Sequence, residues 1–109
     1  MSTKVMVLSA MVALASASAL EAQQPADSSA AIYARSCAAC HGPSGTPKAT
    51  MAGQMTDFAN AQTMSTVADS VMLRILSDGK GRIMPAFKAR LTPEQRNALV
   101  RYIRTLSRH

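Results

Sequence analysis

The residues with the clearest chemical meaning are Cys37, Cys40 and His41, which stand in the run Cys37-Ala38-Ala39-Cys40-His41. Two thiols three positions apart can each add to one vinyl group of a porphyrin, forming two thioether bonds. The histidine that follows can then lie beneath the iron and donate its ring Nε2. The spacing therefore predicts one covalently attached haem, held by Cys37 and Cys40, with His41 as the proximal iron ligand. Its other ring nitrogen is expected to donate to a backbone carbonyl, of Pro43 or Pro47.

A second axial ligand would close the iron to small molecules. Methionine sulfur suits an electron carrier, because a soft thioether favours ferrous iron and raises the reduction potential. Met84 is the favoured candidate: it follows a glycine-containing turn, and Pro85 keeps its backbone extended, so it can be aimed at the face opposite His41. Methionine is usually an adaptable core filler, and Met72, on the apolar stripe of a predicted helix, is best interpreted as packing. The other methionines beyond residue 22 lie in a region without a clear pattern, namely Met51, Met55 and Met64.

The two cysteines have two rival uses. A C-x-x-C pair in an exported chain would ordinarily oxidise, but a thioredoxin-like redox pair needs a βαβ pattern that this sequence does not show. Structural zinc lacks ligands, since beyond Cys37, Cys40 and His41 the only other soft candidate is the terminal His109. The context therefore favours haem over both alternatives.

The first 22 residues have the order of a secretory signal peptide. Lys4 gives a positive start, residues 5–20 are almost wholly apolar, and Ala17-Ser18-Ala19 offers an A-x-A cleavage site. We expect the cut after Ala19 or Ala22. An uncleaved membrane anchor is the alternative, but the apolar run of about 16 residues falls short of the roughly 20 that span a bilayer. The sequence predicts a periplasmic protein with at most peripheral membrane contact.

Cleavage would leave a polar leader over residues 23–28 and one small domain over residues 29–109. The net charge of +6 would survive, since Lys4 and Glu21 are lost together. A basic surface favours acidic partner proteins or anionic membrane surfaces, whereas nucleic acid is unexpected for an exported chain without a dense basic stripe. The chain has no Trp, two Phe and two Tyr, so a haem would supply much of the core of so small a domain.

The elements that must position these groups follow from caps and apolar spacing. A first helix is expected from Asp27 or Ser28 to about Cys37, which shares a face with Tyr33. Residues 43–68 read as a loop around one edge of the haem, with one short helix over Asp57–Gln62, capped by Thr56 or Asp57.

Two further helices are expected in the second half of the chain. One spans Asp69–Ser77, capped by Asp69 and ended by Gly79. The last opens with Thr92-Pro93-Glu94-Gln95, a capping box with proline at the first helical position. One face of this last helix is apolar and carries Leu99, Tyr102, Ile103 and Leu106. The domain is therefore predicted to be all-α.

Together these features resemble the small monohaem class I c-type cytochromes of bacterial periplasms. The resemblance covers about residues 28–107 and rests on Ile32-Tyr33, the run from Cys37 to Gly42, Gly79-Lys80-Gly81 with Met84-Pro85-Ala86-Phe87, Leu91 to Gln95, and Tyr102-Ile103. It implies a cytochrome c-like fold, in which three to four short helices wrap one covalent haem c. It also implies that the first and last helices cross, with Tyr102 against a small residue; Ser29 stands where many members have glycine.

The function expected is that of a one-electron carrier between periplasmic or membrane redox partners, not an enzyme, and without a substrate pocket. Acidic docking faces on those partners would meet basic rim residues, for which ordinary solvated surface is the equal alternative; these are Lys48, Lys80, Arg82 and Lys88. The same site could instead serve as the haem c subunit of a dehydrogenase or oxidase complex. An open iron that binds gas or peroxide, as a sensor or peroxidase, is the remaining alternative, and it requires that Met84 leave the iron free.

Overall fold

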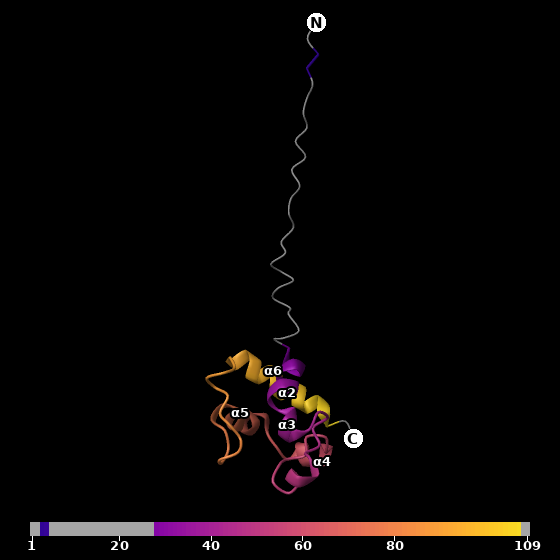
Figure 1. Ribbon diagram of the computed structural model, residues 1–109, viewed down its shortest axis with the longest axis vertical. Helices are drawn as coiled ribbons and strands as arrows, with labels where there is room; N and C mark the ends of the chain where they lie inside the picture. The colour runs from indigo at the N-terminus through magenta and orange to yellow at the C-terminus, as the bar shows by residue number, and fades with distance from the viewer. Residues whose placement is uncertain (1–2, 5–27, 108–109) are drawn as a thin grey trace.

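The computed structural model describes residues 3–4 and 28–107. Their helices are, in chain order, α2 (Ser29–Ser36), α3 (Ala38–His41), the 3-10 helix η2 (Ala49–Met51), α4 (Ala61–Ser65), α5 (Asp69–Asp78) and α6 (Pro93–Leu106). Figure 1 shows them gathered into one small body. Within the described ranges, extended pairing is confined to an isolated antiparallel bridge between Lys80 and Met84. The all-α prediction is confirmed.

The predicted signal peptide (1–22) and polar leader (23–28) lie almost wholly outside the described residues and stay predictions. Among the helices that are described, none combines the length and the apolar character that a bilayer crossing requires.

The first predicted helix forms as α2 followed by α3. The Ser28 hydroxyl accepts a hydrogen bond from the Ala31 amide at 3.2 Å and caps α2. At Cys37 the backbone departs from helical geometry, with φ −121°, so the helix breaks one residue before the predicted end and restarts as α3. Gly42, with φ +80°, then ends α3 in a conformation that favours glycine.

The predicted capping box of the last helix is confirmed. The Thr92 hydroxyl accepts from the Gln95 amide at 3.1 Å, and the Gln95 side-chain carbonyl accepts from the Thr92 amide at 2.9 Å. Pro93 occupies the first turn of α6. The apolar face points inward as expected, since Leu99 and Ile103 are buried.

Two local predictions are wrong. Residues 57–60 form no helix, because the Asp57 carboxylate accepts from the Ala59 amide at 3.0 Å and closes a turn instead. The short helix begins later, as α4, where the Asn60 side chain accepts from the Thr63 amide at 2.9 Å. Asp69 also does not cap α5, since Ala68 holds that position and the Asp69 carboxylate accepts from Arg104 Nε at 2.8 Å.

The core lies where α2, α5 and α6 meet. α6 contacts both α2 and α5, and Figure 1 shows α6 crossing α2. At that crossing the rings of Tyr33 and Tyr102 have centroids 5.3 Å apart and are tilted by 53°. The predicted crossing of the first and last helices is confirmed, and the partner of Tyr102 there is an aromatic ring rather than a small residue. Arg104 of α6 also donates to the carbonyls of Met64 and Val67, which holds α4 and the start of α5 against α6.

Candidate functional site

The corner between α2 and α3 carries both cysteines as free thiols. Because the Cys40 amide donates to the Cys37 carbonyl at 3.2 Å, one tight turn separates them. Cys37 is 8% exposed and belongs to the apolar core, whereas Cys40 is exposed. Burial raises the pKa of the Cys37 thiol to about 11, which keeps its sulfur neutral.

A buried hydrogen bond ties this corner to α2. The Tyr33 hydroxyl donates to the carbonyl of Gly42 at 2.7 Å, directly beyond His41. Burial, with smaller contributions from Cys37 and Tyr102, raises the pKa of the Tyr33 phenol to about 12 and keeps it a neutral donor. The segment that ends at His41 is therefore fixed to the core at its start, through buried Cys37, and just beyond its end, through Gly42.

His41 lies half-buried, and its ring stacks on that of Phe58. The two ring centroids are 4.5 Å apart and the ring planes differ by 15°. Burial lowers its pKa, which favours the neutral imidazole that can donate a lone pair to a metal. Its Nδ1 is buried and has no hydrogen-bond partner among the described residues. The predicted bond to a carbonyl of Pro43 or Pro47 is thus not formed. A buried polar atom without a partner is uncommon in a finished site.

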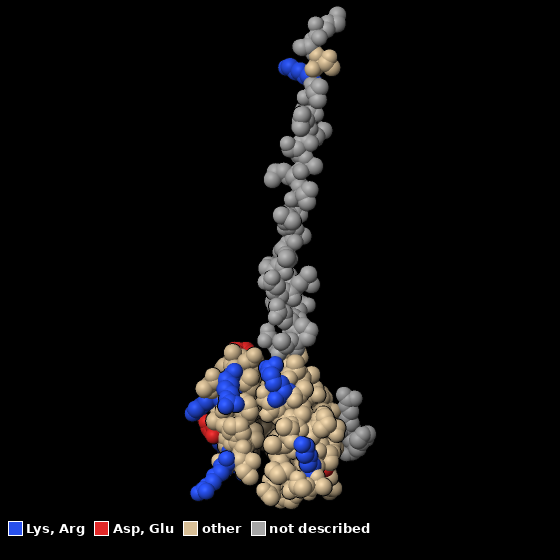
Figure 2. All heavy atoms as spheres, viewed as in Figure 1, with Lys and Arg blue, Asp and Glu red and all other residues tan. Residues whose placement is uncertain are grey.

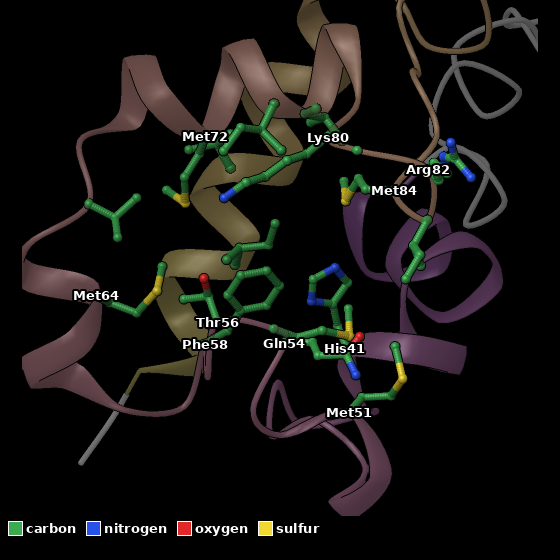
Figure 3. A pocket seen from close by; sticks show the side chains of 18 residues that line it. His41, Met51, Gln54, Thr56, Phe58, Met64, Met72, Lys80, Arg82 and Met84 are labelled. Carbon is green, nitrogen blue, oxygen red and sulfur yellow. The ribbon is translucent and has the colours of Figure 1, made fainter.

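A cavity of about 310 Å³ opens in front of His41. Figure 3 shows the His41 ring on one side and the Met84 side chain on the other, facing each other. All five methionines of the stretch 28–107 line this cavity, including Met72, which was predicted as packing and is also buried in the core. The lining further includes Gln54, Thr56, Phe58, Val67, Ile75, Leu76, Lys80, Gly81, Arg82, Ile83, Val100 and Ile103.

Met84 is held by a closed turn. The Lys80 amide donates to the Met84 carbonyl at 3.0 Å, and the Met84 amide donates to the Lys80 carbonyl at 3.3 Å. Gly79, with φ +76°, lets this turn lie close to the end of α5, because a Cβ there would stand 2.6 Å from the Met84 carbonyl oxygen. The glycine-containing turn predicted before Met84 is confirmed.

The chain after Met84 is fastened to α5. The Phe87 amide donates to the Leu76 carbonyl at 2.9 Å, the Lys88 amide donates to the Ser77 carbonyl at 3.2 Å, and the Phe87 ring is buried. The position of Met84 at the cavity is therefore determined by the last turn of α5.

Sequence reasoning missed Phe58, the ring against which His41 stacks. Its position depends on a contact with Gly45, whose carbonyl accepts from the Phe58 amide at 3.0 Å. A Cβ at Gly45 would lie 2.9 Å from Phe58 Cβ, so glycine is required for this approach. No local pattern around residue 58 indicates the pairing.

The donor set fits a haem. An imidazole and a thioether face each other across an apolar cavity, and two thiols lie four residues and one residue before the imidazole on the same segment. The cavity lining described contains two cations, Lys80 and Arg82, and no acidic side chain. These features match a large, flat, apolar group with anionic substituents.

Comparison with known proteins supports this conclusion. Residues 24–103 match the family model described as cytochrome C oxidase, cbb3-type, subunit III. The chain belongs to this family. It is 37% identical over 71 residues to the cbb3-type cytochrome c oxidase subunit CcoP of Rubrivivax gelatinosus, a match that covers 65% of this chain and 23% of that protein. The chain thus spans about a quarter of the length of that relative.

Two solved structures are also similar. The KustC0563 c-type cytochrome superposes with a TM-score of 0.67 at 30% identity, covering 72% of this chain and 96% of that one. A mutant of the same cytochrome gives a TM-score of 0.65 at 29% identity, with the same coverage. The protein is accordingly a small c-type cytochrome with a cytochrome c-like fold, covalent haem c and a role in electron transfer.

Proposed function

We propose that this cytochrome passes single electrons between other redox proteins, with its haem bound to Cys37 and Cys40 and its iron held between His41 and Met84. The observation that carries the proposal is that His41 and Met84 face each other across one cavity (Figure 3). Imidazole with thioether ligation is the pair that suits a low-spin electron carrier of raised potential.

The haem, when bound, supplies an iron that alternates between the ferric and ferrous states. The chain's own residues do the rest. Neutral His41 offers nitrogen, Met84 offers sulfur, and the apolar lining keeps water away from the iron. Two thioether bonds would prevent loss of the group from an exported protein. The proposed electron transfer needs no side chain to donate or accept a proton, and we therefore expect an electron carrier rather than an enzyme.

The encounter surface is proposed at the turn that carries Met84. Ile83 is 63% exposed, and Arg82 beside it is an exposed cation. An apolar point beside a positive charge suits a partner with an acidic face. The net charge of +6 would attract such a partner to the molecule, and Figure 2 shows that basic side chains predominate over acidic ones on the face drawn. Lys88, also expected at the rim, is 3.6 Å from the Asp78 carboxylate, which partly neutralises it.

A second candidate is a subunit of a cbb3-type oxidase, used in the same chemistry within a complex. The family match and the CcoP relative favour it. Purification of the native protein under mild conditions distinguishes the two: a stoichiometric oxidase partner supports the subunit, and a lone small cytochrome supports the free carrier.

The central experiment is a pyridine haemochrome spectrum of the exported protein, followed by carbon monoxide added to the reduced form. We expect the spectrum of haem with two thioether bonds and no prompt reaction with carbon monoxide. A prompt spectral change would instead support the open-site sensor or peroxidase. Mass analysis of the same sample tests export, which predicts a chain that begins at residue 20 or 23.

A further inference from the structure

We propose that the Lys80 ammonium binds an ionised propionate carboxylate of the haem from inside the cavity, which makes Lys80 a determinant of the reduction potential. The inference rests on the proposed attachment of the haem at Cys37 and Cys40. It concerns a residue for which the sequence suggested only a place on a basic rim.

Two cations of one turn point in different directions. Lys80 and Arg82 both border the cavity. Figure 3 shows the Lys80 side chain running across the cavity so that its ammonium lies on the side of Met72, whereas the Arg82 guanidinium extends away from the cavity centre. The backbone bridge between Lys80 and Met84 fixes the point from which Lys80 reaches inward.

The Lys80 ammonium has no anionic partner among the described residues. Although the residue as a whole is exposed, its side chain forms no ion pair and no hydrogen bond with any residue in the range 28–107. The described lining offers no carboxylate either, and the ammonium extends toward the thioether of Met72. A charge held over apolar groups is stabilised when a counter-charge joins it.

The chemistry of haem supplies that counter-charge. Its two vinyl groups and its two propionates stand on opposite edges of the porphyrin. Since Cys37 and Cys40 would take the vinyl edge, the carboxylates would lie at the part of the cavity remote from α3. The Lys80 ammonium extends toward Met72 of α5, so it is the cation suited to that edge.

This pairing would act on the iron through charge. A carboxylate near the iron favours the ferric state, which carries one more positive charge than the ferrous state. A lysine paired with the carboxylate cancels that effect at short range. Removal of the lysine charge should therefore lower the reduction potential, and a cation outside the cavity should matter less.

The test compares Lys80→Gln with Arg82→Gln, which removes the same charge from the same turn. For Lys80→Gln we expect a threefold to tenfold fall in the equilibrium constant for reduction, roughly 28 to 59 mV for one electron. Arg82→Gln should shift the potential by less than a third of that amount, and Lys80→Arg should stay close to wild type. Resonance Raman spectra should show a shifted propionate bending mode in Lys80→Gln alone.

Equal potential shifts in the two glutamine variants would overturn the inference, because they would indicate general surface charge. An unchanged propionate mode in Lys80→Gln would also overturn it, and so would an altered ferric ligand spectrum at neutral pH, which would indicate that Lys80 binds iron instead. The pyridine haemochrome separates the two proposals: a wild-type protein without two thioether bonds refutes the proposed function, whereas a normal haemochrome with equal shifts refutes this inference alone.

Discussion

The two sides of the cavity are built in different ways. The His41 side is local: Cys37, Cys40 and His41 lie on one tight turn, and the bond from Tyr33 to Gly42 closes it over nine residues. The Met84 side instead depends on α5, because the turn that carries Met84 is held by backbone bonds to the end of that helix.

This difference indicates which side of the cavity is held less firmly. The first side is anchored by a buried phenol, and Tyr33 is among the least exposed residues described. The second side ends in a turn with an exposed isoleucine and a half-buried methionine. We therefore expect His41 to stay in place under conditions that displace Met84.

Removal of the Met84 sulfur should have the largest effect. Met84→Ala takes away the proposed soft ligand, so we expect the equilibrium constant for reduction to fall at least about a hundredfold, or roughly 118 mV for one electron. The reduced variant should also bind carbon monoxide promptly. Redox titration and absorbance spectra measure both effects.

Met51→Ala is the matched control, because Met51 is half-buried and lines the same cavity. Its potential should remain near that of the wild type. An unchanged spectrum in Met84→Ala would refute the ligand assignment, and a large change in Met51→Ala would transfer the role to that residue.

The support of the Met84 side can be broken at Gly79. Gly79→Ala places a Cβ 2.6 Å from the Met84 carbonyl oxygen, at a φ of +76° that disfavours side chains. We expect a loss of about 1–3 kcal/mol in the free energy of unfolding, with weaker Met84 ligation. Chemical denaturation and carbon monoxide binding measure the two consequences.

Gly81→Ala provides the comparison within the same turn. Gly81 also has a positive φ, of +60°, but a Cβ there meets nothing within 4 Å. The variant should lose about 1 kcal/mol from backbone strain alone and keep its ligand spectrum. Equal effects at both glycines would show that close approach to the Met84 backbone is unimportant.

The anchor of the His41 side is Tyr33. Tyr33→Phe leaves the buried Gly42 carbonyl without its donor, so we expect a loss of about 1–3 kcal/mol in the free energy of unfolding. The Met84 ligand spectrum should not change. Tyr102→Phe, which removes the hydroxyl of the half-buried neighbouring ring, should lose less than half as much.

Tyr33 also predicts a dependence on pH. Burial raises its pKa from the ordinary 10.0 to about 12 in the folded chain, so the phenol ionises more readily in the unfolded chain. Its contribution to stability is fully present below pH 10 and is lost as the pH rises toward 12. In Tyr33→Phe this part of the alkaline loss should vanish, and an identical alkaline slope in both proteins would contradict the assignment.

Ile83→Ser should have the smallest effect on the molecule itself. The side chain is 63% exposed, so the free energy of unfolding should change by less than about 0.5 kcal/mol and the potential should stay constant. Electron exchange with an electrode coated by mixed methyl and carboxylate groups should slow, whereas exchange with a hydroxyl-coated electrode should not. Slowing on both surfaces would argue against Ile83 as an encounter residue.

The sequence predicted best where a signal is local. Thr92 and Gln95 are three residues apart, and the side chain of each accepts a hydrogen bond from the backbone amide of the other. The start of α6 could therefore be predicted directly from the sequence. The turn from Cys37 to His41 could be predicted for the same reason, because its residues are neighbours in the sequence. The expected helix over 57–62 failed because Asp57 and Asn60 can each close a turn or cap a helix, and the choice depends on distant contacts.

The remaining features of the site depend on long-range packing. Phe58 reaches His41 because Gly45 lets two backbone segments approach, which no spacing pattern reveals. The role of Asp69 was misread because its partner, Arg104, lies 35 residues away along the chain. Met84 could be selected as the candidate ligand, but its support by Leu76 and Ser77 could not.

The unequal burial of the two cysteines has a consequence for the order of assembly. In the folded chain Cys40 is accessible, whereas Cys37 is 8% exposed, and burial keeps its thiol protonated. A catalyst working on the finished domain would reach one sulfur and miss the other. We therefore expect the thioether bond at Cys37 to form before the domain reaches its folded state.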